Sequence, residues 1–133
     1  RMASKGFVEA LDQATIRQIT EAFVQKFYEA MTTKSTEKLC SLCVEAPQFI
    51  LEGTQTGSRD EFFRKRLNNF ATLRFQLNTI DALAPHDGSI VALITGTVMA
   101  DDAELSFCEH FMLQRGDSDR WFLESSVFRL LLG

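Results

Sequence analysis

Two long segments of alternating side chains near the end of the sequence constrain the fold most. A polar stretch at residues 115–120 separates them, and each is long enough to be a strand. In the first segment, Phe107, Phe111 and Leu113 share one face, because successive side chains of a strand point to opposite sides. The opposite face carries Cys108, His110 and Met112. Both faces bear bulky groups, so we expect neither to be fully exposed to water.

The composition fits a single globular domain, expected to span residues 1–133, and argues against nucleic-acid binding. Of the 133 residues, 45% are hydrophobic, and a chain of this size can bury a core without disulfides or structural metal ions. Twelve phenylalanines lack a polar tip, so most of these rings belong in apolar contacts. A net charge of -4 disfavours contact with phosphate backbones, so we predict no direct nucleic-acid partner.

The cysteine count and the hydropathy pattern bear on where the protein works. Three cysteines, an odd number, argue against a disulfide framework and favour a reducing compartment. No signal peptide is visible, and no apolar run approaches the ~20 residues of a membrane span. We therefore expect a protein of the cytoplasm or the nucleus without a membrane partner.

The first part of the chain has helical periodicity. Over residues 6–31, apolar side chains recur every three or four positions, which predicts one long amphipathic helix. Ser4 is its expected N-cap, and the β-branched pair at residues 32–33 is its expected end. A shorter helix is expected over residues 35–44, ended by Pro47.

A third helix is expected after a short strand at residues 48–52. Ser58, followed three positions later by Glu61, matches a capping box and predicts a helix over residues 59–68. The residues of this helix expected to face the core are Phe62, Phe63 and Leu67. The residues expected to face solvent form a basic run, Arg64, Lys65 and Arg66.

From residue 72 onward the hydrophobic period changes to two. This change predicts strands at residues 74–83 and 90–99, ahead of the two strands described above. Gly96 is expected to mark a bulge or a bend. Helices followed by a run of antiparallel strands indicate an α+β fold. We expect the N-terminal helices to pack on a strongly bent antiparallel sheet that forms a cone with an internal cavity.

Two sets of side chains are candidates for a chemical centre. A zinc set would combine a Cys-x-x-Cys pair with two residues of one strand: Cys40, Cys43, Cys108 and His110. An acid–base set inside the cone would contain Tyr28, Asp81, His86 and His110. Free cysteine in an amphipathic helix usually behaves as a small hydrophobe, and no spacing of nucleophile and base is recognisable. We therefore assign no catalytic residue, no metal ligand and no cofactor.

Acidic residues gather at the predicted turn over residues 100–104. This turn contains Asp101, Asp102 and Glu104, and Glu52 ends the short strand before Gly53. A solvated turn is the simpler interpretation. The alternative is an acidic rim around the mouth of an apolar cavity. Such a rim would suit a partner that inserts an aromatic residue flanked by Lys or Arg.

Five short stretches, in order along the chain, resemble the nuclear transport factor 2 family. They are residues 22–28, Leu51-Glu52-Gly53 followed by Gly57, residues 96–102, Phe107-x-Glu109-x-Phe111-x-Leu113, and Trp121 followed by residues 127–130. The resemblance covers nearly the whole chain, from residue 16 to residue 131. Residues 7–14 also look like the small subunit of the heterodimeric messenger-RNA export receptor, a relative with the same fold.

The resemblance implies a non-enzymatic nucleocytoplasmic transport factor. In the family, a dimeric carrier imports Ran-GDP: Ran inserts a phenylalanine into the cavity, and rim acids pair with its basic residues. Carried onto this sequence, the rim acids would be Glu52, Asp101 and Asp102. The cavity wall would include Leu51, Leu67, Leu105 and Phe128. The family tryptophan that helps to bind Phe-Gly nucleoporin repeats corresponds to Arg17 here.

The resemblance also implies dimerisation through the outer face of the bent sheet. On this chain the dimer face would carry Cys108, His110 and Met112. The implied partners are a second copy, Ran-GDP and Phe-Gly nucleoporins, and the implied locations are cytoplasm, nucleus and nuclear pore. Two alternatives stay open. One is the export-receptor subunit, whose heterodimer uses the same sheet face, and the other is a small-molecule isomerase or dehydratase in the cone.

Overall fold

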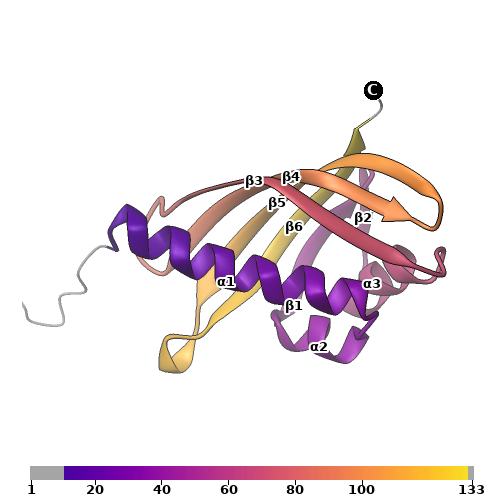
Figure 1. Cartoon of the computed structure of the whole chain (residues 1–133). Coiled ribbons are helices and arrows are strands. Elements are labelled where there is room, and N and C mark those ends of the chain that lie inside the picture. The colour runs from indigo at the N-terminus through magenta and orange to yellow at the C-terminus, as the bar shows by residue number, and fades with distance from the viewer. Residues whose placement is uncertain (1–10, 132–133) are drawn as a thin grey trace, which may run out of the picture.

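The computed structural model describes residues 11–131 and shows in them three α-helices packed on a curved six-stranded sheet (Figure 1). In chain order the elements are α1 (Gln13–Thr32), α2 (Thr36–Ser41), β1 (Cys43–Leu51), β2 (Thr54–Thr56), α3 (Arg59–Leu67), β3 (Leu73–Leu83), β4 (Ser89–Ala100), β5 (Ala103–Arg115), a one-turn 3-10 helix (Asp117–Asp119) and β6 (Trp121–Leu131). The predicted α+β class and the bent sheet are confirmed.

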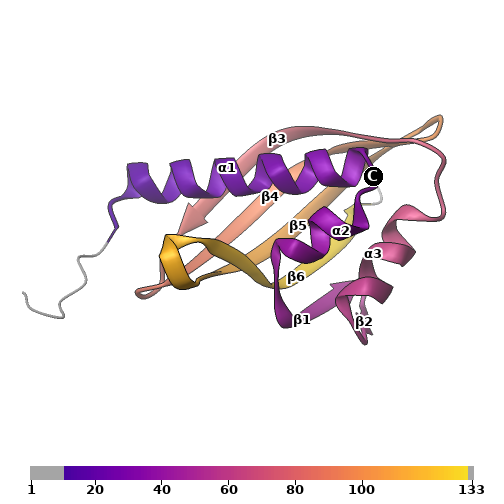
Figure 2. The same cartoon turned by 90° about the horizontal axis from the view of Figure 1, so that it is seen from below.

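The sheet has the strand order β2-β1-β6-β5-β4-β3. The four long strands β3 to β6 form the predicted antiparallel meander. The sheet is nevertheless mixed, because β1 lies beside β6 and runs parallel to it. It does not close into a barrel, so β2 and β3 are its edges. Figure 2 shows the helices lying across one face of the sheet.

The first helix begins later than the periodicity predicts. Asp12 has an extended backbone, and its side chain accepts a hydrogen bond from the Thr15 N–H at 2.7 Å, so it is the N-cap of α1. A continuous helix from residue 6 is therefore wrong, and Ser4 lies outside the described residues. The predicted end is confirmed to within one residue, since α1 ends at Thr32.

The second helix is shorter than predicted. Ser35, expected as its first residue, is instead its N-cap, and α2 ends at Ser41, with β1 beginning at Cys43. Pro47 lies inside β1 rather than after a helix, in the interval where the pairing with β6 changes register. Proline lacks the N–H that a sheet ladder requires, and an irregular interval of this kind tolerates it.

The third helix begins as predicted, but one of its basic residues faces the core. The Ser58 hydroxyl accepts a hydrogen bond from the Glu61 N–H at 3.2 Å and caps α3. Phe62 and Phe63 are fully buried, as expected. Arg66 was predicted to face solvent and is only 6% exposed. It follows Phe62 by one helical turn, so the two side chains share the inward face.

Gly96 marks the predicted bend. A Cβ atom at this position would come within 2.3 Å of the Gln76 carbonyl oxygen, so only glycine fits. Opposite Gly96, β3 contains a register shift between Leu77 and Thr79, which is where a bulge bends the strand. This bend helps to give the sheet the curvature that a flat pair of strands would lack.

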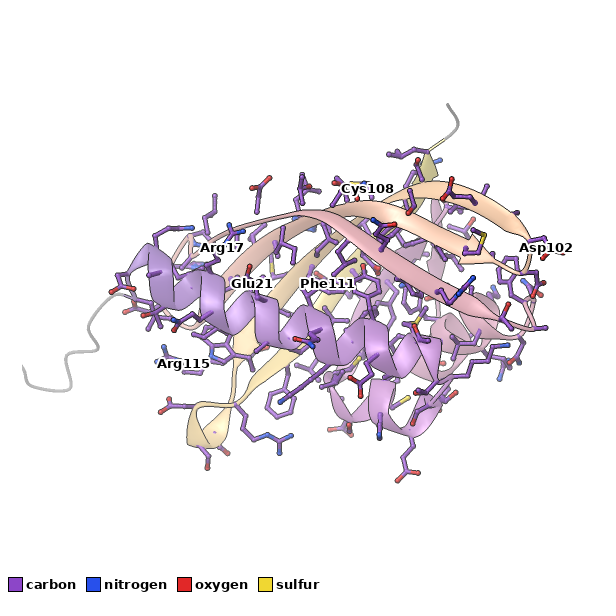
Figure 3. All side chains as sticks on the ribbon, viewed as in Figure 1. Arg17, Glu21, Asp102, Cys108, Phe111 and Arg115 are labelled. Carbon is purple, nitrogen blue, oxygen red and sulfur yellow. The ribbon has the colours of Figure 1, made fainter. Side chains whose placement is uncertain are left out.

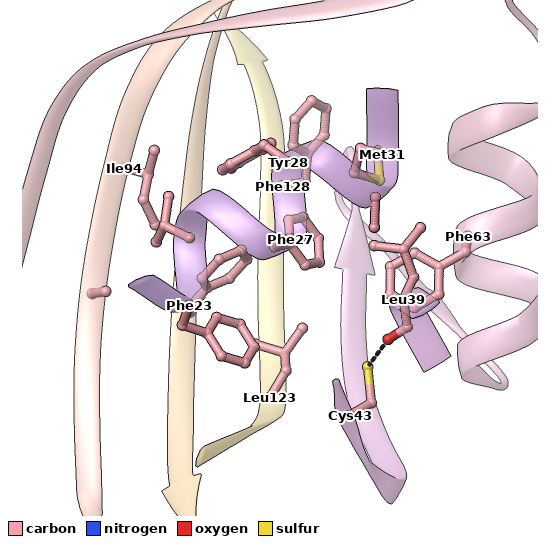
Figure 4. Close-up of a cluster of buried hydrophobic side chains, with 14 of the residues drawn as sticks. Phe23, Phe27, Tyr28, Met31, Leu39, Cys43, Phe63, Ile94, Leu123 and Phe128 are labelled. Carbon is pink, nitrogen blue, oxygen red and sulfur yellow. Dashed lines mark hydrogen bonds between the residues drawn. The ribbon is translucent and has the colours of Figure 1, made fainter. Parts of the chain in front are cut away.

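The core lies between the helices and the concave face of the sheet. Eight of the twelve phenylalanines are buried there. The ring of Phe27 on α1 lies 4.8 Å from that of Phe111 on β5. It lies 6.0 Å from that of Phe63 on α3, and Figure 4 shows both Phe27 and Phe63 in the core. Within residues 11–131, no helix has the length and apolar character needed to cross a membrane.

Candidate functional site

A cavity of about 180 Å³ opens between the end of α1, α3 and the concave face of the sheet. Its walls are mostly apolar: Met31, Leu51, Phe70, Leu73, Phe75, Val98, Ala100, Leu105, Phe128 and Leu130. Its polar lining consists of Glu52, Lys65, Arg66 and Asn69. An engineered apolar cavity of about 150 Å³ is large enough to hold benzene. The volume here therefore admits one aromatic ring.

Three of the four predicted wall residues line this cavity. Leu51, Leu105 and Phe128 contribute side chains from β1, β5 and β6, three neighbouring strands. Leu67 does not line it, because this residue of α3 is buried in the hydrophobic core. The wall thus combines the consecutive strands β5 and β6 with β1, a strand distant in sequence that pairs with β6.

Glu52 lies at the cavity, where it also has a structural contact. It occupies the turn between β1 and β2 with a φ of 50°, next to Gly53. Its N–H donates to the Phe128 carbonyl at 3.0 Å, and its Oε1 accepts from the Leu130 N–H. The carboxylate therefore extends the pairing of β1 with β6 while presenting negative charge to the cavity.

The other two predicted rim acids do not line the cavity. Asp101 has a φ of 54° in the turn between β4 and β5, and its Oδ1 accepts from the N–H groups of Ala71 and Thr72, each at 2.9 Å. It holds the segment that follows α3. Asp102 is exposed in the same turn (Figure 3).

Lys65 gives the lining a mixed charge that the sequence pattern did not predict. This residue of α3 lines the cavity and pairs with Glu61 one turn earlier, N to O at 3.1 Å. Glu52 and Lys65 therefore place one acidic and one basic group at the cavity.

A buried ionic network lies behind the cavity. Glu109 is 0% exposed, and its carboxylate accepts two hydrogen bonds from Arg66, at 2.6 and 3.1 Å. It also accepts one bond from the Tyr28 hydroxyl and one from the Ser126 hydroxyl, each at 2.7 Å. The Arg66 guanidinium lies 4.1 Å from the ring centroid of Phe128, a cavity wall residue. The network therefore helps to hold the Phe128 side chain in place in the cavity wall.

The sequence contained a signal for this network: charged residues at positions that the hydrophobic periodicity assigns to the core. Glu109 is in phase with Phe107 and Phe111, so a core-facing strand position carries a carboxylate. A buried charge requires a partner, and Arg66 is in phase with Phe62 on α3. Tyr28 completes the set from α1. No short spacing could have shown that these side chains meet.

The network has little capacity for acid–base chemistry. A carboxylate has about four lone-pair sites, and four donors fill them at Glu109. Burial raises the pKa of the Tyr28 phenol well above its usual value, and the neighbouring negative charge of Glu109 raises it further. The Tyr28 hydroxyl is therefore not poised to exchange a proton near neutral pH.

The two chemical centres considered from the sequence are not assembled. Of the acid–base set, Tyr28 is buried while Asp81 and His86 are exposed and His110 lies on the outer face of the sheet. Among the described residues, no group of three potential metal ligands lies close enough to hold an ion. Cys43 is buried in the core, and burial raises the pKa of its thiol to about 12.

The outer face of the sheet carries the predicted dimer residues. Cys108, His110 and Met112 alternate with the buried face of β5 and are half-buried. Cys108 is visible on the side of the sheet opposite α1 (Figure 3). The exposed large apolar side chains of the described chain share this face: Ile50, Leu83, Leu93, Val127 and Leu131. His110 pairs directly with Leu93 and Val127, which makes the surface continuous across three strands.

Comparison with known sequences gives one family. The sequence model of the nuclear transport factor 2 (NTF2) domain matches residues 19–130. The chain is 25% identical to nuclear transport factor 2 of Neurospora crassa over 117 residues, which cover 86% of this chain and 94% of the relative.

Solved structures share the fold. A structure of nuclear transport factor 2 from Cryptosporidium parvum is 26% identical, with a TM-score of 0.78, and the match covers 88% of this chain and 95% of that one. A candidate dehydratase of the nuclear transport factor 2-like family from Streptomyces avermitilis has a TM-score of 0.75 over 90% of this chain and 98% of that one. At 17% identity, this second likeness shows the fold alone.

Proposed function

This chain belongs to the nuclear transport factor 2 family, and from that premise we propose that it is a non-enzymatic nucleocytoplasmic transport factor. Its cavity would take an aromatic side chain from a partner protein, with Ran-GDP the partner that the family suggests. The volume of about 180 Å³, with apolar walls and Glu52 among its lining residues, is the observation that carries the proposal. The protein would work in the cytoplasm and the nucleus and pass through nuclear pores.

The mechanism rests on shape and charge. An inserted ring would contact Leu51, Leu105 and Phe128, and burial of an aromatic anchor in such a pocket supplies much of the binding energy of an interface. Glu52 and Lys65 would fix the flanking residues of the partner. Asp102, exposed on a neighbouring turn, would attract basic residues without entering the cavity.

The proposed transport factor is a dimer formed through the outer face of the sheet. The apolar row of Ile50, Val127, His110 and Leu93 crosses four adjacent strands and is not covered by any helix of the described chain. Exposed apolar patches of this continuity mark interaction sites. A second copy is the favoured occupant, and a larger export-receptor partner would use the same surface.

Binding of purified Ran-GDP to immobilised protein tests the cavity assignment. Leu105→Trp should fill the cavity and weaken Ran-GDP binding roughly tenfold or more, because the anchor loses its space. Asp102→Lys should weaken binding by a smaller factor through charge alone. Glu45→Lys, an exposed substitution outside the cavity lining, is the matched control. Undiminished binding by Leu105→Trp with an intact fold would contradict the proposal.

Glu52 needs a milder substitution than charge reversal. Its Oε1 accepts from the Leu130 N–H, so Glu52→Lys would disturb the strand pairing as well as the charge. Glu52→Gln keeps an oxygen acceptor and removes only the charge. A loss of Ran-GDP binding in Glu52→Gln with unchanged thermal stability would assign the effect to the carboxylate.

The nucleoporin contact requires a separate measurement. Arg17, which replaces the family tryptophan, pairs with Glu21 at 3.3 Å and donates to the Ile80 carbonyl at 3.4 Å. A charged side chain engaged in this way offers little apolar surface to a phenylalanine repeat. We expect Phe-Gly repeats to bind through other residues, and titration of wild-type protein and Arg17→Trp with a repeat peptide would show a gain in the variant.

Identification of the stoichiometric partner separates the transport alternatives. Affinity purification from cells should return a second copy of this chain for the carrier. A larger protein at equal stoichiometry would indicate the export-receptor subunit instead. An isomerase or dehydratase activity is disfavoured because the four donors around Glu109 leave it no free lone pair for a substrate.

A further inference from the structure

A groove of about 610 Å³ runs between α1 and β3, the edge strand of the sheet. Its lining includes Tyr28, Phe75, Leu77 and Ile80 on the apolar side. It shares only Phe75 with the cavity described above, so the two openings are separate sites. Nothing in the proposed carrier function uses this groove.

At one end of the β3 edge, side chains of α1 already donate hydrogen bonds to the backbone carbonyls. The Gln13 side chain donates to the Ala82 carbonyl at 2.9 Å, and Arg17 donates to the Ile80 carbonyl at 3.4 Å. In Figure 3, Arg17 and Glu21 lie on the side of α1 that faces β3. These side chains cover the edge carbonyls that an extended partner would otherwise reach.

The rest of the edge has no such cover. Phe75, Leu77 and Ile80 pair with Val98, Gly96 and Ile94 of β4. These three partners lie at every second position of β4. The backbone groups of Leu77 and Phe75 therefore point the same way as those of Ile80, outward from the sheet. In the described part of the chain, no side chain donates a hydrogen bond to the carbonyl of Phe75 or Leu77.

The helix side of the groove is acidic. Glu21, Gln25 and Glu29 line the groove at successive turns of α1, and all three are exposed. Glu29 has no ion-pair partner among the described residues, whereas Arg17 partly neutralises Glu21. The β3 edge can pair with an extended backbone, the apolar lining can contact apolar side chains, and the carboxylates can attract positive charge.

We propose that this groove binds an extended peptide of a partner protein, which adds as a strand to the free edge of β3. The backbone of the peptide pairs with Phe75 and Leu77, its alternate apolar side chains enter the groove, and its Lys or Arg residues face Glu21 and Glu29. Strand addition of this kind takes its affinity from main-chain bonds and its specificity from alternate side-chain pockets.

Selection of a random-peptide phage library on the folded protein tests the proposal. Selected sequences should alternate apolar residues with Lys or Arg, and synthetic copies should bind the wild-type protein. Glu29→Lys should weaken the synthetic peptide roughly fivefold, and Gln25→Glu should strengthen it roughly twofold, by the usual size of exposed charge contacts. Glu45→Lys is the control, since it lies outside the groove lining.

Amide exchange distinguishes strand addition from a side-chain contact elsewhere. The outward N–H groups of Phe75 and Leu77 should exchange rapidly in the free protein and become protected when the synthetic peptide binds. Leu105→Trp, which blocks the cavity, should leave this binding unchanged. The proposal is overturned if no peptide is selected, or if Glu29→Lys and Gln25→Glu leave the affinity for the synthetic peptide unchanged. It is also overturned if the amides of Phe75 and Leu77 gain no protection.

Discussion

At the scale of single residues, the pair of Arg66 and Glu109 is the most consequential feature of the chain. Both charges are removed from water, at 6% and 0% exposure, and each depends on the other. Removing one partner of a buried pair costs more than the pair contributes, because the remaining charge stays unsolvated. The pair also joins α3 to β5, so its loss would loosen the cavity wall at Phe128.

A double-mutant cycle measures this dependence. Arg66→Met should lower the free energy of unfolding by about 3–5 kcal/mol, because Glu109 loses its counter-ion. Glu109→Gln in the same background should recover at least about 1 kcal/mol, since a neutral amide still accepts from Tyr28 and Ser126. Urea denaturation gives both values. Additive losses in the double variant would mean that the charges act independently.

Tyr28 should make the stability of the fold depend on pH in the alkaline range. Its folded pKa is raised by burial and by Glu109, so the unfolded chain releases this proton first as the pH passes about 10. The stabilisation is complete below that pH and is lost above it, by up to about 1.4 kcal/mol per pH unit. Tyr28→Phe should therefore lose less stability than the wild type from about pH 9 to about pH 11.

The same titration has a direct optical readout. Tyr28 is the single tyrosine of the chain, so the near-ultraviolet tyrosinate signal reports this residue alone. In the folded protein the signal should appear only as the protein unfolds. A reversible tyrosinate signal at about pH 10 without unfolding would contradict the buried position of Tyr28.

At the scale of elements, α3 decides the shape of the cavity. It is short, at nine residues, and it supplies Lys65 to the cavity lining and Arg66 to the buried network. A helix of this length depends on its cap and its packing, because nucleation is unfavourable in isolation. Ser58 provides that cap, and Asp101 fixes the segment that follows the helix.

Removal of the cap should therefore be measurable. Ser58→Ala should destabilise the protein by about 1 kcal/mol and speed amide exchange in α3, because the Glu61 N–H loses its acceptor. Ser58→Asp keeps an oxygen at the capping position and should behave like the wild type. Equal stability of Ser58→Ala and wild type would show that packing alone holds the start of the helix.

At the scale of the whole molecule, the outer face of the sheet is the surface through which we expect the chain to dimerise. Helices cover only the concave side (Figure 1), and the apolar side chains of the other side remain partly exposed. Val127 is central to this surface, since it pairs with His110 on β5 and with Ile50 on β1. A charge there would be buried in any dimer formed through the sheet.

Val127→Glu should consequently convert a dimer to a monomer, as measured by light scattering, without loss of secondary structure by circular dichroism. Its side chain is 41% exposed in the single chain, so the monomer tolerates the change. Gln18→Glu adds the same charge on an exposed position of α1 and should leave the dimer intact. A wild type that is monomeric at every concentration would remove the sheet face as a self-association surface.

The sequence by itself determined the class of the fold and most of its local signals. The change of hydrophobic period from helical to alternating located the four long strands, and their hairpin connections follow from short polar turns. Ser58 was identified as a cap because it acts on its own backbone neighbours, and Gly96 as a bend because a glycine inside a strand pattern is typical of one. The family resemblance then predicted four wall residues of a cavity; Leu51, Leu105 and Phe128 line it, whereas Leu67 lies in the core.

Only the tertiary structure decided which distant residues share an environment. Arg66 and Glu109 lie 43 positions apart, and Tyr28 and Glu109 lie 81 apart, so no local pattern could pair them. The parallel pairing of β1 with β6 and the use of Asp101 as a loop anchor depend on the same long-range packing. Local periodicity records which side of an element is buried, whereas a charge on a buried side is satisfied only by whatever the folded chain brings to it.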